Sequence, residues 1–298
     1  MKRAKTDSRR MSRTAYSFLL PAVVAIFLVI IVPMVLAIFI TFHDVNLVET
    51  GGAMIPNGAR NFVTLFKDHR FFHSIVISLL YVVTAVSIET VLSVAIALLL
   101  DRKFHGRNLV RTLIIIPMFI TPVVVGLSWR MFYDPTSGII NYLLGVLGLG
   151  TRHDWLGNAA IALPAIVLAD VWEWTPFMIL IVLAGLESIP QELYEAAVVD
   201  GTTRMTAIRY ISIPLVLPAI VVAMIFRVVD AMKAFDLIYV MTKGGPGLAT
   251  ETTNLYAYTI GFQYFRIGYA TTVALVFTVI ATAVSSAFVS RLFRQSRA

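Results

Sequence analysis

The residues of this chain that could do chemistry are polar groups set inside long apolar stretches. One such group is Asp170-Val171-Trp172-Glu173-Trp174-Thr175-Pro176, in which carboxylates alternate with tryptophans. Carboxylates accept hydrogen bonds from hydroxyl groups, and tryptophan faces stack on the apolar faces of sugars. An aromatic belt at a membrane interface, combined with ordinary packing, explains the same residues. Both interpretations stay open, because the sequence does not fix how deep Trp172, Glu173 and Trp174 lie.

A second set of polar residues lies in other apolar runs. Arg227 and Asp230 are three residues apart, so on a helix they share a face and can neutralise each other. Because charges inside a membrane are costly, such a helix is expected to line a seam or a pathway and not to face lipid. Glu89 interrupts another run, either as a hydrogen-bond partner between helices or as a transport group.

Several kinds of chemistry are missing from the sequence. It has neither a phosphate-binding G-x-x-x-x-G-K-[ST] loop nor an H-E-x-x-H zinc motif. Its five histidines lie in predicted loops or at the ends of apolar runs, and the lack of cysteine excludes disulfides, iron–sulfur clusters and thiol catalysis. We therefore predict no catalytic residue, no metal site and no cofactor bound by this chain.

The elements that must position these residues are membrane helices. The 298 residues are 58% hydrophobic and 14% charged, whereas soluble domains have about a quarter charged residues. A span needs about 20 apolar residues, which predicts an all-α integral membrane protein with six transmembrane helices. We expect a basic tail at 1–14 and a single transmembrane domain over 15–298, with spans at about 15–42, 73–100, 109–133, 159–184, 213–240 and 268–290. The first run is too long for the core of a cleaved signal peptide and is expected to remain as an anchor.

The distribution of Lys and Arg predicts the orientation. Of 24 such residues, 15 fall in the tail, 101–111, 187–212 and 291–298, and 8 fall in or beside the other loops. By the positive-inside rule, both termini are cytoplasmic. This topology explains the net charge of +7 better than a nucleic-acid partner does, so we predict no nucleic acid.

The stretch 192–214 is a polar island between two apolar runs. Pro190 suits a helix start, Gly201 suits a helix end, and 202–210 can restart a helix. Glu195-Ala196-Ala197, three residues, Gly201, nine residues, then Ile211-Ser212-Ile213-Pro214 resembles the EAA loop of ABC-importer permeases, with Ile213 where that family has Leu. The resemblance implies a coupling helix between spans 4 and 5 that docks on a cytoplasmic ATPase. Its candidate residues are Glu192, Glu195, Ala196, Ala197, Asp200 and Gly201.

A second resemblance narrows the family. The run from Phe235 to Pro246, FDLIYVMTKGGP, is similar to the end of span 5 in carbohydrate-importer permeases of the maltose and glycerol-3-phosphate type, in the first of two unlike permease subunits. It adds Phe235 and Tyr239 to the substrate-pathway candidates Trp172, Glu173, Trp174, Arg227 and Asp230.

The resemblance implies a permease subunit of an ATP-driven, binding-protein-dependent importer of a sugar, oligosaccharide or polyol in the bacterial inner membrane. Its implied partners are a second homologous permease, two copies of an ATPase that holds ATP and Mg²⁺, an extracytoplasmic solute-binding protein and the lipid bilayer. An ion-coupled secondary transporter is the alternative, and it needs acids such as Glu89 and Asp230 to bind the ion. An intramembrane enzyme is disfavoured by the missing motifs.

Overall fold

The computed structural model describes residues 18–102, 104–150 and 153–295 as a succession of helices with one short hairpin. Among the described residues, five helices are long and apolar enough to cross a membrane, and two helices that meet at a 99° bend form a sixth span if they cross it together. This confirms a helical membrane protein with several spans. The basic tail predicted at 1–14 lies outside the described residues. Within them, the helices long and apolar enough to cross a membrane are Phe18–Thr41, α4 (His69–Leu100), α8 (Ala162–Glu187), Arg204–Ala231 and Ile267–Ala287.

One compact unit consists of the chain up to Asp68 together with Ala257–Val276. Its two strands pair antiparallel. The side-chain amide of Asn61 donates hydrogen bonds to the carbonyl oxygens of Thr41 and His43, at 2.9 and 3.0 Å, which fixes the turn after the first span. The unit contains η1 (Phe27–Ile31), α2 (Val32–Thr41), β1 (His43–Asp44), β2 (Ile55–Pro56), α3 (Arg60–Leu65), η4 (Thr259–Gln263) and the start of α14 (Ile267–Gln295).

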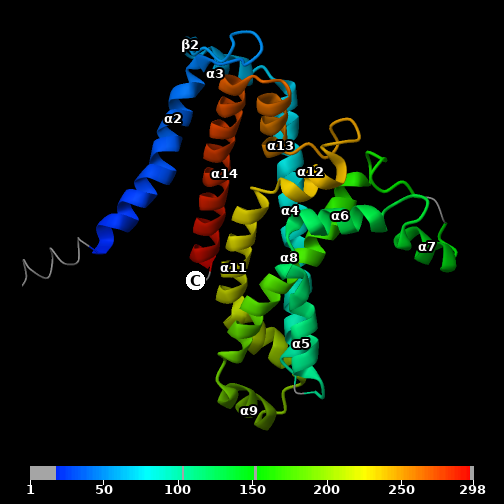
Figure 1. The fold of residues 1–298 in the computed structure, drawn as a ribbon. Helices are drawn as coiled ribbons and strands as arrows, with labels where there is room; N and C mark the ends of the chain where they lie inside the picture. Colours follow the sequence, from blue (N-terminus) through cyan, green and yellow to red (C-terminus); the bar gives the residue numbers. More distant parts are fainter. Residues whose placement is uncertain (1–17, 103, 151–152, 296–298) are drawn as a thin grey trace, which may run out of the picture. The chain divides into compact units, whose positions relative to one another are not determined.

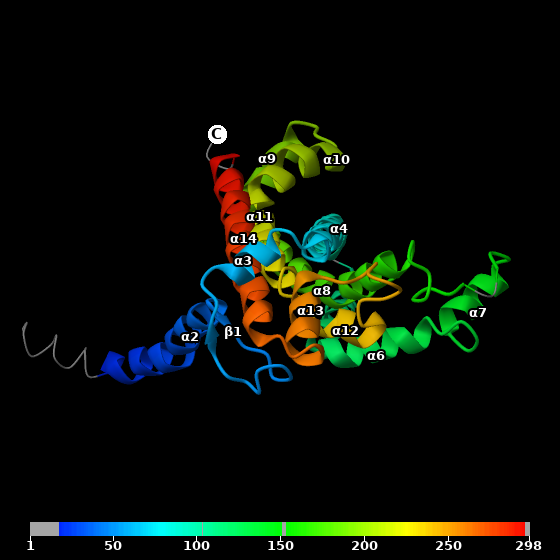
Figure 2. The ribbon, with the colours of Figure 1, turned by 90° about the horizontal axis from the view of Figure 1, so that it is seen from above.

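The other unit consists of His69–Tyr256 and the chain from Phe277 onward. In both ribbon views α4 and α8 run beside α11 (Ile213–Ala231) (Figures 1 and 2). A Cβ added to Gly185 of α8 would lie 2.7 Å from the Cβ of Ala219 in α11, so glycine permits the close approach that membrane helices favour. The buried residues packed there are Ala97, Leu100, Ile179, Val182, Leu183, Leu186, Val216 and Ile220.

Shorter helices connect and flank these three. They are α5 (Arg107–Ile115), η2 (Ile116–Phe119), α6 (Pro122–Phe132), α7 (Ile139–Val146), α9 (Gln191–Val199), α10 (Arg204–Ala207), η3 (Ile208–Ser212), α12 (Asp236–Thr242) and α13 (Thr253–Tyr258). The prediction that one transmembrane domain spans 15–298 stays a prediction.

The stretch expected to form one span over 109–133 is two helices in the structure. Helical structure from Arg107 to Phe119 is followed, after a 99° bend, by Pro122–Phe132. Ile120 and Thr121 at the bend are extended, with ψ of 137° and 143°. The ring of Pro122 clashes with a helical conformation of the residue before it, so the apolar run is long enough for a span but cannot continue straight.

The helix expected over 213–240 has different ends. It begins at Arg204, passes through η3 and ends at Ala231. Pro214 lies inside this continuous helix, directly after the π-helical turn η3, where the backbone already departs from the regular α-helical hydrogen-bond pattern. The helix is longer than the uncharged run 211–226, because it extends before that run into the polar island and after it through Arg227 and Asp230. The helix α12 is separate and starts at Asp236.

Candidate functional site

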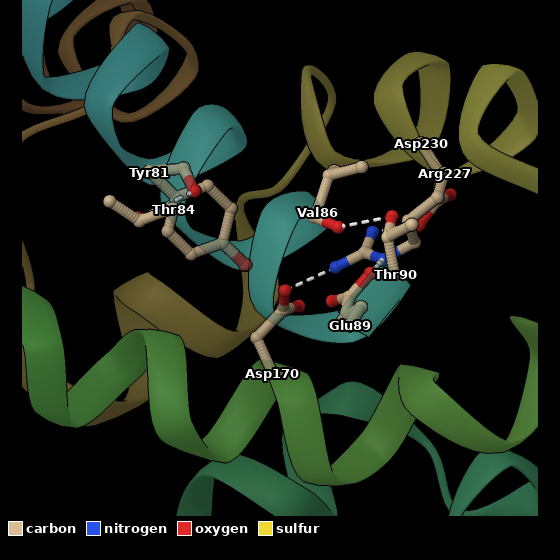
Figure 3. A network of polar contacts seen from close by, with 8 residues as sticks. All are labelled: Tyr81, Thr84, Val86, Glu89, Thr90, Asp170, Arg227 and Asp230. Atoms are coloured by element: carbon tan, nitrogen blue, oxygen red, sulfur yellow. Dashed lines mark hydrogen bonds and ion pairs between the residues drawn. The ribbon is translucent and has the colours of Figure 1, made fainter. Parts of the chain in front are cut away.

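The centre of the larger unit is a buried cluster of charges on three helices. Arg227 of α11 donates from Nε to Glu89 of α4 at 2.8 Å and from an Nη to Asp230 at 3.1 Å. Its other Nη donates to Asp170 of α8. Figure 3 shows the guanidinium directed toward the carboxylates of Glu89 and Asp170. One cation thus ties together α4, α8 and α11.

Three charged side chains of this cluster are buried, so each needs a partner of opposite charge. Arg227 is 1% exposed, Glu89 0% and Asp170 3%. Charges removed from water are tolerated only when they are paired and hydrogen-bonded, and the planar guanidinium can serve several acceptors at once. The Asp230 side chain is 51% exposed, so its contact with Arg227 is the weakest of the three. The pairing expected from sequence, Arg227 with Asp230, is present, but the buried partners come from other helices.

A small cavity adjoins the cluster. It has a volume of about 120 Å³. The ring of Trp174 covers the guanidinium of Arg227 at 5.2 Å. Glu173 is 1% exposed, and its Oε2 has no hydrogen-bond partner among the described residues. The cavity therefore presents an aromatic face and a free acceptor, a combination that suits a hydroxylated guest. Its lining includes five of the predicted pathway residues, Glu173, Trp174, Arg227, Asp230 and Phe235, together with Asp170 and Lys233.

The two remaining pathway candidates lie elsewhere. Trp172 is 41% exposed, packs edge-on against Trp129 with ring centroids 6.0 Å apart, and lines a separate apolar hollow of about 520 Å³. Trp172 and Trp174 diverge because successive helical residues are about 100° apart. Tyr239 stacks on Phe235 at 5.4 Å but does not itself line the small cavity.

The polar island forms a helix, a glycine turn and a second helix. Pro190 precedes α9, and Gly201 after it has φ of +71°. Thr202 N–H donates to the carbonyl of Ala197 at 2.9 Å, which closes the end of α9. Ala197 is the buried member of the six coupling candidates. The others, Glu192, Glu195, Ala196, Asp200 and Gly201, are exposed.

Sequence reasoning missed an ion-pair joint, which we define as Arg107, Arg111, Glu187 and the carbonyl of Leu100. Both arginines of α5 reach Glu187 Oε1, at 3.1 and 2.6 Å. Arg107 Nε also donates to the Leu100 carbonyl at 2.5 Å. The joint connects the end of α4 to the end of α8, four residues before α9 starts. The i, i+4 spacing of the arginines was visible in the sequence, but it gave no indication of their partner.

Comparisons with known proteins identify the family of the chain. Residues 89–297 match the family described as "Binding-protein-dependent transport system inner membrane component". The trehalose/maltose transport system permease protein MalF of Thermococcus litoralis is 36% identical over 260 residues, which cover 87% of this chain and 85% of that one. The trehalose transport system permease protein SugA of Mycobacterium tuberculosis is 32% identical over 273 residues, which cover 91% and 86%.

A solved structure supports the same fold. A chain of a bacterial ABC transporter involved in the import of the acidic polysaccharide alginate superposes with a TM-score of 0.82 at 25% identity, covering 99% of this chain and 98% of that one.

Proposed function

The chain belongs to the family of binding-protein-dependent inner-membrane transport components, and from this premise we propose that it is the sugar-conducting permease subunit of an ATP-driven importer. Its substrate is a sugar, oligosaccharide or polyol. The observation that carries the proposal is the buried cluster around Arg227 with its adjoining cavity, which supplies hydrogen-bond acceptors and an aromatic face in the middle of three packed helices.

The proposed pathway runs past Glu173, Trp174, Asp230 and Phe235. Each nitrogen of the Arg227 guanidinium already donates to a carboxylate, so Arg227 holds the helices and leaves substrate binding to its neighbours. Hydroxyl groups can donate to Glu173 Oε2, which is buried without a described partner. Trp172 and Tyr239 are support residues in this scheme, because neither lines the cavity.

Coupling to ATP hydrolysis is assigned to α9. With both termini in the cytoplasm, α9 lies on the cytoplasmic side between spans 4 and 5. Its Val198 and Val199 are 74% and 87% exposed, which is a large apolar surface for so short a helix and is consistent with docking into a partner. The partner is a pair of ATPase subunits that bind ATP and Mg²⁺, while this chain binds no cofactor.

The ion-pair joint gives α9 a route to the helix bundle. A displacement of α9 moves the end of α8, and Glu187 passes that displacement through Arg107 and Arg111 to the end of α4. Because α4 and α8 both hold Arg227, the same movement reaches the cavity. ATP binding then alternates the pathway between its two sides, together with a second homologous permease and an extracytoplasmic binding protein.

The test is reconstitution of the chain in vesicles with the second permease, the ATPase and the binding protein. We expect sugar accumulation and ATP hydrolysis that the loaded binding protein stimulates. Glu195→Lys should abolish the stimulation, whereas Glu49→Lys, a matched reversal at another exposed glutamate, should not. Uptake driven by an ion gradient without ATP would overturn the proposal in favour of a secondary transporter.

Topology can be tested separately, because the chain has no cysteine. A single cysteine at Thr202 should react only with reagents that reach the cytoplasm. One at Leu248, which is 37% exposed, should react only from outside. The reverse labelling pattern contradicts the proposed orientation.

A further inference from the structure

The helix α7 exposes a continuous apolar stripe. Its large apolar side chains recur at i, i+3, i+4, i+7 and i+8, which places them on one helical face. They are 46–70% exposed. A contiguous surface of this kind is unusual where a protein faces water. The stripe consists of Ile139, Tyr142, Leu143, Val146 and Leu147.

The opposite face of α7 is fixed to the connecting loop. Asn141 is 3% exposed; its side-chain amide donates to the carbonyl of His153 at 2.9 Å, and its Oδ1 accepts from Trp155 Nε1 at 2.9 Å. Trp155 packs on Tyr133 at 5.5 Å, and the Tyr133 hydroxyl donates to Ala165 of α8 at 3.0 Å. The orientation of the stripe is therefore set by the fold.

The turn before α7 is also ordered. The Asp134 carboxylate accepts hydrogen bonds from the hydroxyl and backbone N–H of Thr136, at 2.7 and 2.9 Å, and from those of Ser137, at 3.0 and 2.8 Å. The hydrogen bond from the Thr136 hydroxyl, with the other three, lowers the pKa of Asp134, so the residue is charged at neutral pH. The charge thus lies in the turn before α7 and is not part of the stripe.

Charge and position together indicate what covers the stripe. No Lys, Arg, Asp, Glu or His occurs from Pro135 to Gly150. The segment joins α6 to the start of α8, so it lies where the chain leaves one span and enters the next, at the end of α8 opposite α9. Both ribbon views place α7 beyond the end of α6 (Figures 1 and 2). α6 itself exposes apolar side chains, including Leu127 at 50% and Met131 at 73%, so the apolar surface continues from a membrane-embedded helix onto α7.

We propose that α7 is an interfacial helix whose apolar stripe lies in the lipid, at the boundary between headgroups and acyl chains. A short uncharged amphipathic helix beside a span is suited to that depth, and Tyr142 in the stripe is typical of the interface. Lipid fits better than a soluble binding protein, because Tyr142 alone among the five stripe residues has a side chain that could form the polar contacts of a reversible interface. The helix anchors the end of α6 at Phe132, opposite the bend at Pro122, and gives the moving bundle a fixed point in the bilayer.

The experiment uses single cysteines in the full chain, labelled with a polarity-sensitive fluorophore. The positions are Leu143→Cys and Val146→Cys in the stripe, and Thr136→Cys as an exposed control on the polar turn. The proteins are placed in vesicles of phosphatidylcholine and phosphatidylglycerol that carry a nitroxide near the carbonyl end of the acyl chains. We expect the lipid nitroxide to quench both stripe labels several-fold more than aqueous iodide does, and the control to show the opposite order.

Two outcomes overturn the proposal. If iodide quenches the stripe labels as strongly as it quenches the control, the stripe faces water. If iodide quenches them in vesicles alone but not after the binding protein is added, that protein covers the stripe. Neither outcome depends on sugar uptake, so the transport function stands or falls separately. Two stripe positions are used so that a local effect of one label does not decide the result.

Discussion

Replacing Arg227 by methionine tests the role of the buried charge cluster. Methionine keeps a similar length and a good helix propensity but removes the cation. Glu89 and Asp170, which are 0% and 3% exposed, then lose the partner that joins α4 and α8 to α11. Breaking a buried ion pair on one side costs about 3–5 kcal/mol. The contact with the half-exposed Asp230 adds at most about 1 kcal/mol.

The expected loss is large enough to measure. Since 1.4 kcal/mol is a factor of about ten in an equilibrium constant, Arg227→Met should shift the folding equilibrium by more than roughly 100-fold. In detergent, the assay is the amount of monodisperse protein that survives a temperature series, followed by size-exclusion chromatography. Arg209→Met is the matched control: it lies on the same continuous helix, is exposed and should cost at most about 0.5 kcal/mol.

A third variant separates lost pairing from lost packing. Glu89→Gln and Asp170→Asn combined with Arg227→Met remove both buried carboxylates that lost their partner and leave only the half-exposed Asp230 charged, so most of the stability should return. The reasoning is refuted if Arg227→Met is as stable as the parent, or if the triple variant is no more stable than the single one. In either case the cluster does not hold the three helices together through charge.

Three further predictions concern the coupling helix, helix packing and the pathway. Gly201 has positive φ and open space around its Cβ position. Gly201→Val should therefore cost about 1–2 kcal/mol in the turn and reduce stimulated ATP hydrolysis, whereas Gly201→Asn should be tolerated. Equal ATPase stimulation in the two variants would contradict this prediction. Gly185→Leu should lower the yield of assembled complex, because a Cβ at this position would lie 2.7 Å from the Cβ of Ala219 in α11 and overpacking costs about 1–3 kcal/mol. Unchanged thermal stability of the variant would contradict this prediction. Trp174→Ala should lose sugar uptake with the complex intact, while Trp172→Ala should lower the amount of complex recovered. Identical behaviour of the two variants would contradict the assignment of Trp174 to the pathway and of Trp172 to packing. Each readout is compared with the parent chain at matched expression.

The sequence by itself determined the features that depend on local spacing. Hydropathy located the apolar runs, because a run of about 20 apolar residues has few alternatives to crossing the bilayer. It missed the bend within 109–133, and the helix expected over 213–240 is Arg204–Ala231 in the structure. The helix before Gly201 and its positive φ followed from composition, because glycine adopts that conformation without strain. The divergence of Trp172 and Trp174 followed from the helical period alone.

Tertiary structure decided which distant groups meet. Glu89 is 138 residues from Arg227 in the chain and Asp170 is 57 away, so several acids could have paired with this arginine. The nearest one, Asp230, proved to be the most exposed of its partners. Pairing depends on how α4, α8 and α11 pack, and helix packing is a sum over many small contacts that no single spacing encodes.

The same reasoning explains the bend and the ion-pair joint. The span expected over 109–133 took no account of Pro122, and the 99° angle depends on how the two helical pieces pack against their neighbours. Arg107 and Arg111 indicated a cytoplasmic side through their charge, whereas Glu187 became their partner only because α5 and the end of α8 lie together in the fold. Local patterns specify elements, and long-range packing selects among the partners that those elements offer.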